Sequence, residues 1–268
     1  MGAVKLLFQK GSWTASDFPC EILYRICGGH MAQLYVARLK HTEHLVVVKA
    51  AAVNTIAATL LEKEAKILQH LHYKGIPEVY TYQKDTEKSY YIMSYHKGLT
   101  IEQYMQRNGC MFEKTICTTV QQLCQILAYL HSERVRLVHN DLKPSNVLLQ
   151  ENGEVILLDF GLAEYIEHAH QTDICFQGTF GYAAPECWHR KQLGNRIESD
   201  IFSLGATLYY MLEAKSPKDC YGKFILSEQN HTKKNRWQPV LDKCCALNIE
   251  QRYQNTALVY KNLCQIKF

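Results

Sequence analysis

The pattern of apolar residues changes near residue 96, and this change constrains the fold more than any other feature of the sequence. Before it, short runs rich in β-branched and aromatic residues alternate with polar or glycine-containing turns, as in EILYRI (21–26), HLVVVKA (44–50) and KSYYIMSY (88–95). After it, apolar residues recur at helical spacing, most clearly in 113–133. The sequence therefore predicts an α+β fold, with a small β-rich part followed by a larger helical part.

Composition narrows the class of protein. The 268 residues are 47% hydrophobic and 21% charged, as in ordinary soluble globular proteins. The net charge of +4 is too small and too evenly spread to indicate a nucleic-acid partner. Eleven cysteines without paired CxxC motifs favour reduced thiols. The most apolar stretch, 201–212, is too short to cross a bilayer, so we expect no membrane insertion. The reduced thiols predict a cytoplasmic protein, with a nuclear location as the alternative.

The helix predicted over 54–71 carries a carboxylate on its apolar face. The apolar stripe consists of Ala57, Leu60, Leu61, Ile67, Leu68 and Leu71. Glu64 falls in the middle of this stripe, and an unpaired charge on a buried face is very costly. Lys49, which ends the apolar run LVVV, is a lysine in a similarly unusual place. We therefore expect Lys49 and Glu64 to form an ion pair.

Several strings together resemble a known family. They are HNDLKPSN (139–146), LLDFGLAE (157–164), GTFGYAAPE (178–186), VVVK (46–49) and SDIFSLG (199–205). The first three are similar to the catalytic loop, metal-binding loop and activation-segment end of eukaryotic-type protein kinases, and they occur in that family's order and spacing. The match covers about residues 20–264.

The resemblance implies a two-lobed protein kinase fold in one catalytic domain. A short extension would occupy 1–19, a β-rich N-lobe with one main helix 20–95, and a mainly helical C-lobe 96–268. It also implies structural roles for three residues. Glu186 and Arg252 would form a buried ion pair, and Asp200 would anchor the backbone of the catalytic loop.

The activity implied by the resemblance is transfer of the γ-phosphoryl group of ATP to a Ser or Thr hydroxyl of a protein substrate. Asp141 would accept or orient the hydroxyl proton, and Lys143 would reach the moving phosphoryl group. Asn146 and Asp159 would be the metal ligands, because their oxygens suit Mg²⁺, with Mn²⁺ as an alternative.

The remaining expected site residues would surround the nucleotide. They are Cys27, Gly29, Leu34, Val47, Lys49, Glu64, Met93, Ser94, Tyr95, His96 and Leu148. Lys49, oriented by Glu64, would hold the α- and β-phosphates. By the same alignment Met93 is the gatekeeper, 94–96 form the hinge, and Leu148 packs beneath adenine.

The phosphate-binding loop departs from the family. ICGGHMAQLYVA (26–37) places Cys27 and Ala32 at two of the three glycine positions, and only Gly29 is retained. Glycine permits close backbone approach and positive φ, so these replacements should weaken nucleotide binding without abolishing it.

The catalytic loop departs at one position, where Asn140 replaces the usual arginine. That arginine pairs with a phosphate on the activation segment, and asparagine cannot form such a charge pair. The chemistry does not need the arginine, so we expect activity independent of activation-segment phosphorylation. Thr172 and Thr179 are the threonines of that segment, and neither is predicted to be an obligatory switch.

Two alternatives to an active Ser/Thr kinase are open. The degenerate glycine loop favours a pseudokinase, a binding module with little phosphoryl transfer, but retention of the whole catalytic set disfavours it. A small-molecule phosphotransferase is disfavoured by GTFGYAAPE (178–186), which is typical of a platform for an extended peptide.

The basic stretch 215–237 is a candidate docking surface for a protein partner.

Overall fold

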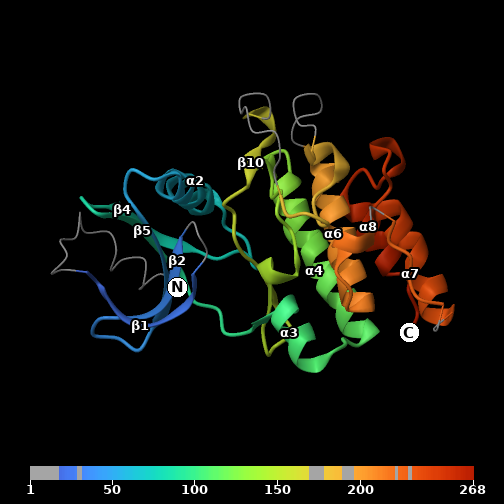
Figure 1. Ribbon diagram of the computed structural model, residues 1–268, viewed down its shortest axis with the longest axis horizontal. Coiled ribbons are helices and arrows are strands. Elements are labelled where there is room, and N and C mark those ends of the chain that lie inside the picture. Colours follow the sequence, from blue (N-terminus) through green and yellow to red (C-terminus); the bar gives the residue numbers. More distant parts are fainter. Residues whose placement is uncertain (1–17, 29–31, 169–177, 189–195, 221–222, 229–230) are drawn as a thin grey trace. The chain divides into compact units, whose positions relative to one another are not determined.

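The computed structural model describes residues 18–28, 32–168, 178–188, 196–220, 223–228 and 231–268, and the chain divides into two compact units (Figure 1). Unit 1 comprises 1–72 and 76–97, and unit 2 comprises 73–75 and 98–268. Unit 1 is built on a β-sheet and unit 2 is mainly helical. The predicted α+β, two-lobed fold is therefore confirmed.

Unit 1 contains a five-stranded antiparallel sheet. In spatial order its strands are β1 (Cys20–Gly28), β2 (Gln33–Leu39), β3 (Leu45–Ala52), β5 (Lys88–Ser94) and β4 (Val79–Lys84). Alternate residues point to opposite faces of a strand. One face buries a cluster made of Cys20, Ala37, Leu39, Val46, Val48, Tyr90 and Ile92. The intervening residues of β3 therefore face the other side of the sheet.

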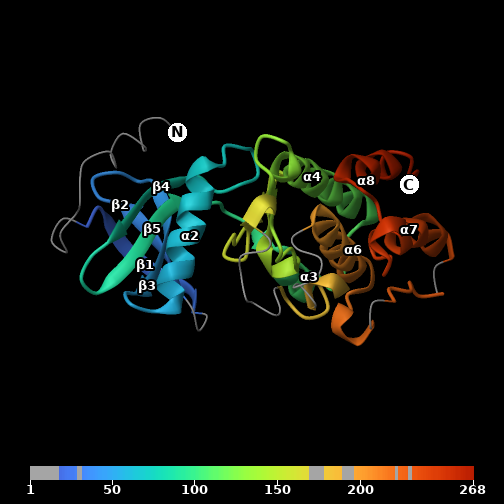
Figure 2. The ribbon, with the colours of Figure 1, turned by 90° about the horizontal axis from the view of Figure 1, so that it is seen from above.

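The helix of unit 1, α2 (Ile56–His70), packs against β3, β4 and β5 (Figure 2). It begins after Thr55, whose side chain accepts a hydrogen bond from the Ala58 N–H at 3.1 Å. The buried face of α2 consists of Ala58, Leu61, Glu64, Ala65, Ile67 and Leu68. Glu64 thus lies on the apolar face, as its spacing predicted.

Unit 2 is organised around two long helices, α4 (Glu113–His131) and α6 (Ile197–Glu213), which pack against each other (Figure 2). α7 (His231–Cys244) contacts α6, and α8 (Thr256–Leu263) contacts α4. α6 is buried over nearly its whole length, as the apolar stretch 201–212 predicted. Among the described residues, no helix combines the length and the apolarity needed to cross a membrane.

Short strands and 3₁₀ helices flank the loops of unit 2. β6 (Leu99–Thr100) leads into α3 (Ile101–Asn108) and joins β8 (Val147–Leu149) and β9 (Val155–Leu157) in a three-stranded sheet. β7 (Leu137–Val138) pairs with β10 (Glu164–Tyr165). The 3₁₀ helices are Pro144–Asn146, Ile166–His168, Pro185–Trp188, Pro217–Cys220 and Ile249–Gln251. The loop 139–143 is therefore held between β7 and the first of these 3₁₀ helices.

Candidate active site

The backbone of the loop 139–143 is fixed by one buried carboxylate. Asp200, in the first turn of α6, is fully buried. Its two oxygens accept hydrogen bonds from the backbone N–H groups of His139 and Asn140, each at 2.9 Å. His131 Nε2, at the end of α4, lies 2.8 Å from Asp200 Oδ2. The predicted anchoring role of Asp200 is confirmed, and two helices share in it.

Neighbouring groups keep the Asp200 carboxyl ionised. Burial alone would raise the pKa of this carboxyl, but the hydrogen bond and charge of His131, and then those of His139, outweigh it and lower the pKa. Asp200 is therefore ionised at neutral pH, as a carboxylate that accepts three hydrogen bonds requires.

Asp141, Lys143 and Thr179 form a closed polar triangle. Lys143 Nζ lies 2.7 Å from Asp141 Oδ2, and the Thr179 hydroxyl donates to Asp141 Oδ1 at 2.6 Å. Lys143 Nζ also donates to Thr179 Oγ1 at 2.8 Å. Asp141 is 7% exposed, so its carboxylate is held in a defined orientation while one edge of the triangle remains accessible through Lys143. The segment 178–186 thus contacts the catalytic loop directly.

Asn146 completes this cluster from the 3₁₀ helix Pro144–Asn146. Its Nδ2 donates to the backbone oxygen of Asp141 at 2.9 Å and to Asp141 Oδ2 at 3.1 Å. This orientation turns the amide oxygen away from Asp141, and that oxygen accepts no hydrogen bond among the described residues. Asn146 therefore presents an oxygen that a hard cation could use.

Asp159 is positioned by its flanking residues. It has a positive φ of 60°, and its side chain is exposed while the following Phe160 is fully buried. The Phe160 ring meets the His139 ring edge-on, with centroids 4.8 Å apart, and His139 Nε2 lies 3.2 Å from the Leu158 oxygen. His139 and Phe160 therefore hold the Asp159 backbone next to the catalytic loop.

Asn140 links the catalytic loop to the segment after Asp159. Its φ is +65°, a region that asparagine tolerates better than most residues. Its Nδ2 donates to the Leu162 carbonyl oxygen at 3.1 Å. Its own carbonyl oxygen lies close to Gly178, where an added Cβ would sit 3.1 Å from it. Asn140 thus contacts the residues after Asp159 and also the start of 178–186.

In unit 1 the predicted ion pair is present. Lys49 Nζ lies 2.7 Å from Glu64 Oε2, and the two side chains are 12% and 3% exposed. Lys49 shares its face of β3 with Val47, whose sheet neighbour on β5 is Met93. The charges of Lys49 and Glu64 therefore compensate each other at a largely buried position.

The other expected nucleotide residues lie on separate elements. Leu34 is the β2 partner of Lys49, and Leu148 is half-buried on β8 of unit 2. The Ser94 hydroxyl accepts from the Glu78 N–H at 3.0 Å and lies 2.8 Å from His96 Nε2. Burial, with a smaller effect of Tyr24, raises the pKa of Tyr95.

Three positions of the predicted site are not described in full. Gly29 and Thr172 lie outside the described residues. For Cys27, the backbone pairs with that of Leu34, and its side chain is outside the described set. The effect of the degenerate glycine loop on nucleotide binding therefore stays a prediction.

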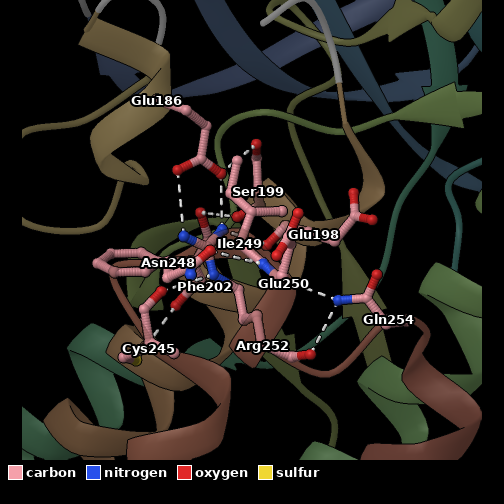
Figure 3. Close-up of polar contacts among 12 residues, drawn as sticks. Glu186, Glu198, Ser199, Phe202, Cys245, Asn248, Ile249, Glu250, Arg252 and Gln254 are labelled. Carbon is pink, nitrogen blue, oxygen red and sulfur yellow. Dashed lines mark hydrogen bonds and ion pairs between the residues drawn. The ribbon is translucent and has the colours of Figure 1, made fainter.

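The ion pair between Glu186 and Arg252 is present and bidentate (Figure 3). Arg252 Nη1 and Nη2 lie 2.6 Å and 3.1 Å from the two Glu186 oxygens, and Ser199 Oγ donates to Glu186 Oε1 at 2.9 Å. Arg252 also donates to the Glu198 backbone oxygen. Burial opposes ionisation of Glu186, but the hydrogen bonds and charge of Arg252 outweigh it and lower its pKa. The pair ties 178–186 to the helical part of unit 2.

Sequence reasoning missed two contributions to the site. His131 supports Asp200, and the signal was its place four residues after Leu127, on the apolar face of α4. Thr179 contacts Asp141 across a separation of 38 residues. No local pattern could reveal that contact, because it depends on how the segment 178–186 folds back.

The cations of the predicted docking segment, 215–237, are largely paired within the chain. Lys234 pairs with Glu228, and Lys233 lies 4.0 Å from Glu213. Arg236 Nη1 lies 2.7 Å from Glu113. The segment still carries a positive balance, because its six Lys and Arg residues outnumber Asp219 and Glu228, and Lys218 and Lys223 are exposed.

Comparison with known proteins agrees with this geometry. The protein kinase domain family matches residues 21–262. The chain is 31% identical to mouse Aurora kinase C over 76% of its own length and 73% of that protein. It is 28% identical to serine/threonine-protein kinase PknD of Protochlamydia amoebophila over 92% of its length, but over only 30% of that protein. It is 29% identical to the Aurora kinase of Dictyostelium discoideum, of which it spans 53%.

The family match covers most of the chain, including both units and the polar cluster around Asp141. Several relatives are considerably longer than the matched region. The match therefore does not show that this chain has the activities of those whole proteins. What the match does establish is the domain: the chain belongs to the protein kinase family.

Proposed function

We propose that the chain is an active, ATP-dependent Ser/Thr protein kinase that does not require activation-segment phosphorylation. The observation that carries this proposal is the closed cluster of Asp141, Lys143 and Thr179, with distances of 2.6–2.8 Å. Phosphoryl transfer depends mainly on positioning and on charge stabilisation. A carboxylate and an ammonium that are already oriented meet that requirement.

The donor set fits a nucleotide with a divalent cation, as used by the family. Bound Mg²⁺, or Mn²⁺ as an alternative, would neutralise charge on the ATP phosphates. Asn146, through its unbonded amide oxygen, and Asp159, through its exposed carboxylate, would be the cation's ligands. Lys49, held by Glu64, would bind the α- and β-phosphates. Val47, Met93 and Leu148 would contact the base.

Asp141 would accept or orient the proton of the acceptor hydroxyl. Its Oδ1 already accepts a hydrogen bond from the aliphatic hydroxyl of Thr179, which is the chemical type of a Ser or Thr acceptor. Lys143, 2.7 Å from Oδ2, would stabilise charge on the transferred group. The partner is then a protein with a Ser or Thr acceptor. The proposal includes docking of this protein on the segment 215–237.

The test is transfer of labelled γ-phosphate from Mg-ATP to a generic protein substrate, measured for wild type, Asp141→Asn and Lys49→Met. Loss of a general base costs about 10²–10⁴-fold in rate. We expect both variants to lose most of the signal while they remain folded by circular dichroism. Asp242→Asn, on α7, serves as a control with the same type of change away from the cluster. Equal signal from all four proteins would contradict the proposal.

A pseudokinase is the second candidate, and the replacement of two loop glycines by Cys27 and Ala32 favours it. The same proteins distinguish the two functions in a thermal shift experiment with Mg-ATP. A nucleotide-dependent shift without phosphoryl transfer by wild type would support the pseudokinase.

A further inference from the structure

The segment 178–186 contains a tight turn beside the polar cluster around Asp141. The backbone N–H of Tyr182 donates to the Thr179 oxygen at 3.0 Å, so Phe180 and Gly181 occupy the two central positions of the turn. Gly181 has a φ of +88°, which glycine adopts without strain. The Thr179 hydroxyl, at the start of this turn, donates to Asp141. The turn therefore begins at the proposed site of phosphoryl transfer.

Lys218 packs directly against this turn. It belongs to the 3₁₀ helix Pro217–Cys220, which begins at the buried Pro217. A Cβ atom added to Gly181 would lie 2.8 Å from the Lys218 backbone nitrogen, 3.0 Å from its Cα and 3.0 Å from its Cγ. Because glycine has no side chain, the two segments can approach this closely. The aliphatic part of the Lys218 side chain thus lies along the turn.

The ammonium group of Lys218 has no carboxylate within ion-pair distance among the described residues. Lys218 is exposed to solvent. Its neighbour Lys215 lies 4.0 Å from Glu213, and Lys143, the other cation close to the turn, is paired with Asp141. An exposed cation without a partner, next to the proposed transfer site, attracts an anionic group of an incoming ligand.

Two further side chains define the surroundings of the turn. Phe180 is 49% exposed, and an exposed aromatic ring suits a peptide better than a free ion. Burial, and then Tyr210 and the Glu102 carboxylate, raise the pKa of Tyr182. Glu102 therefore places negative charge on the Tyr182 side of the turn, whereas Lys218 places positive charge at Gly181. A peptide that crosses the turn meets charges of opposite sign along it.

We propose that Lys218 is a specificity-determining residue that binds an acidic side chain of the protein substrate close to the acceptor hydroxyl. The substrate class is then a protein in which Asp or Glu lies near the Ser or Thr acceptor in sequence. The contact between Lys218 and Gly181 carries this proposal, because it holds an unpaired ammonium beside the turn that begins at Thr179.

The inference rests on the proposed kinase function, since it needs a peptide whose hydroxyl lies at Asp141. Gly181 follows Thr179 by two residues, and an extended chain advances about 3.3 Å per residue. The acidic residue of the substrate therefore lies within a few positions of the acceptor. Lys218 also belongs to the segment 215–237, so one cation of that proposed docking surface is assigned a ligand.

The test uses peptides with one serine in an alanine-rich background, in which glutamate, glutamine or lysine occupies each position up to about five residues from the serine. Fluorescence anisotropy gives the Kd of each peptide, and initial rates with Mg-ATP give kcat and KM. At one position or at neighbouring positions, we expect the glutamate peptide to bind about three- to fivefold more tightly than the glutamine peptide. KM should follow Kd while kcat changes little. The difference should shrink at about 0.5 M salt, because salt screens exposed charges.

Lys218→Gln should remove the preference for glutamate, and Lys218→Glu should reverse it in favour of lysine at the same position. The matched control, Lys261→Gln, removes one charge from an exposed position of α8 in the same unit and should keep the wild-type preference.

A preference for glutamate that persists in both Lys218 variants, or phosphoryl transfer by wild type without any charge preference, would overturn the role of Lys218. A preference in Kd that Lys218→Gln removes, without phosphoryl transfer by wild type, would support that role and contradict the kinase function. The two proposals can therefore fail separately.

Discussion

Asn140 Nδ2 donates a hydrogen bond to the carbonyl oxygen of Leu162 at 3.1 Å. The bond joins the catalytic loop to the segment that follows Asp159, and both of its partners are neutral groups of the chain. The arginine that the family usually has at this position pairs with a phosphate on the activation segment. The structure thus contains a phosphate-independent link at the place where the family usually has a switch.

The first prediction follows from this link. Wild-type protein treated with a phosphatase should keep its transfer rate within about twofold, because the bond from Asn140 to Leu162 joins two neutral groups of the chain. The measurement is the initial rate before and after treatment, with mass spectrometry to verify that phosphate has been removed. A loss of tenfold or more would show that the segment depends on phosphorylation.

A second prediction distinguishes the effect of the backbone conformation of Asn140 from the effect of its side-chain hydrogen bond. Asn140→Ala loses the bond to Leu162 and places an alanine at φ +65°, which costs about 1–2 kcal/mol. Asn140→Gly loses the same bond without that strain. We expect both variants to transfer phosphate more slowly, and only the alanine variant to be clearly less stable in urea. Equal stability of the two would mean that the backbone conformation changes on substitution.

Thr179 gives the third prediction. Thr179→Val keeps the shape of the side chain but removes the hydroxyl that contacts both Asp141 and Lys143. Hydrogen bonds to charged groups contribute about 1.5–3 kcal/mol, so kcat should fall about tenfold or more. The KM for ATP should change little. Thr179→Ser restores the hydroxyl and should recover most of the rate; failure of that rescue would argue against the hydrogen bond.

The fourth prediction concerns stability and pH. Glu186→Gln removes one charge from a buried pair and should cost about 3–5 kcal/mol of unfolding free energy at neutral pH. The pKa of Glu186 is lowered on folding, so its stabilisation is fully present above its ordinary pKa of 4.5 and is lost as pH falls through the lower folded value. Urea titrations from pH 7 to pH 3 should therefore show that the unfolding free energy falls less steeply with decreasing pH for Glu186→Gln than for wild type.

The control for that series is Glu250→Gln, at an exposed position of the 3₁₀ helix next to Arg252. Its stability should stay within about 0.5 kcal/mol of wild type. If the unfolding free energy of Glu186→Gln and of wild type fell equally with decreasing pH, Glu186 would not contribute to the pH dependence.

The sequence predicted those parts of the fold that depend on local periodicity. α2 and α4 lie where apolar spacing placed them, and Glu64 was identified as needing a cation because it interrupts an apolar stripe. α2 begins two residues later than predicted, at Ile56, because Thr55 caps it. The N-cap hydrogen bond rather than the hydrophobic pattern sets that boundary.

Other features of the site could not be predicted from local patterns. The Asn140–Leu162 and Thr179–Asp141 bonds join residues 22 and 38 positions apart, and each depends on the course of a loop. Contacts of this kind are determined by tertiary packing.

The function proposed for the cluster around Asp141 is the transfer of phosphate to aliphatic hydroxyls. The most direct measurement is single-turnover transfer from Mg-ATP to matched peptides that differ only in a Ser, Thr or Tyr acceptor, by wild type and Asp141→Asn. We expect phosphoserine and phosphothreonine from wild type, no phosphotyrosine, and a rate at least about 10²-fold lower for the variant. Equal rates for the two proteins, or phosphotyrosine as the main product, would contradict it.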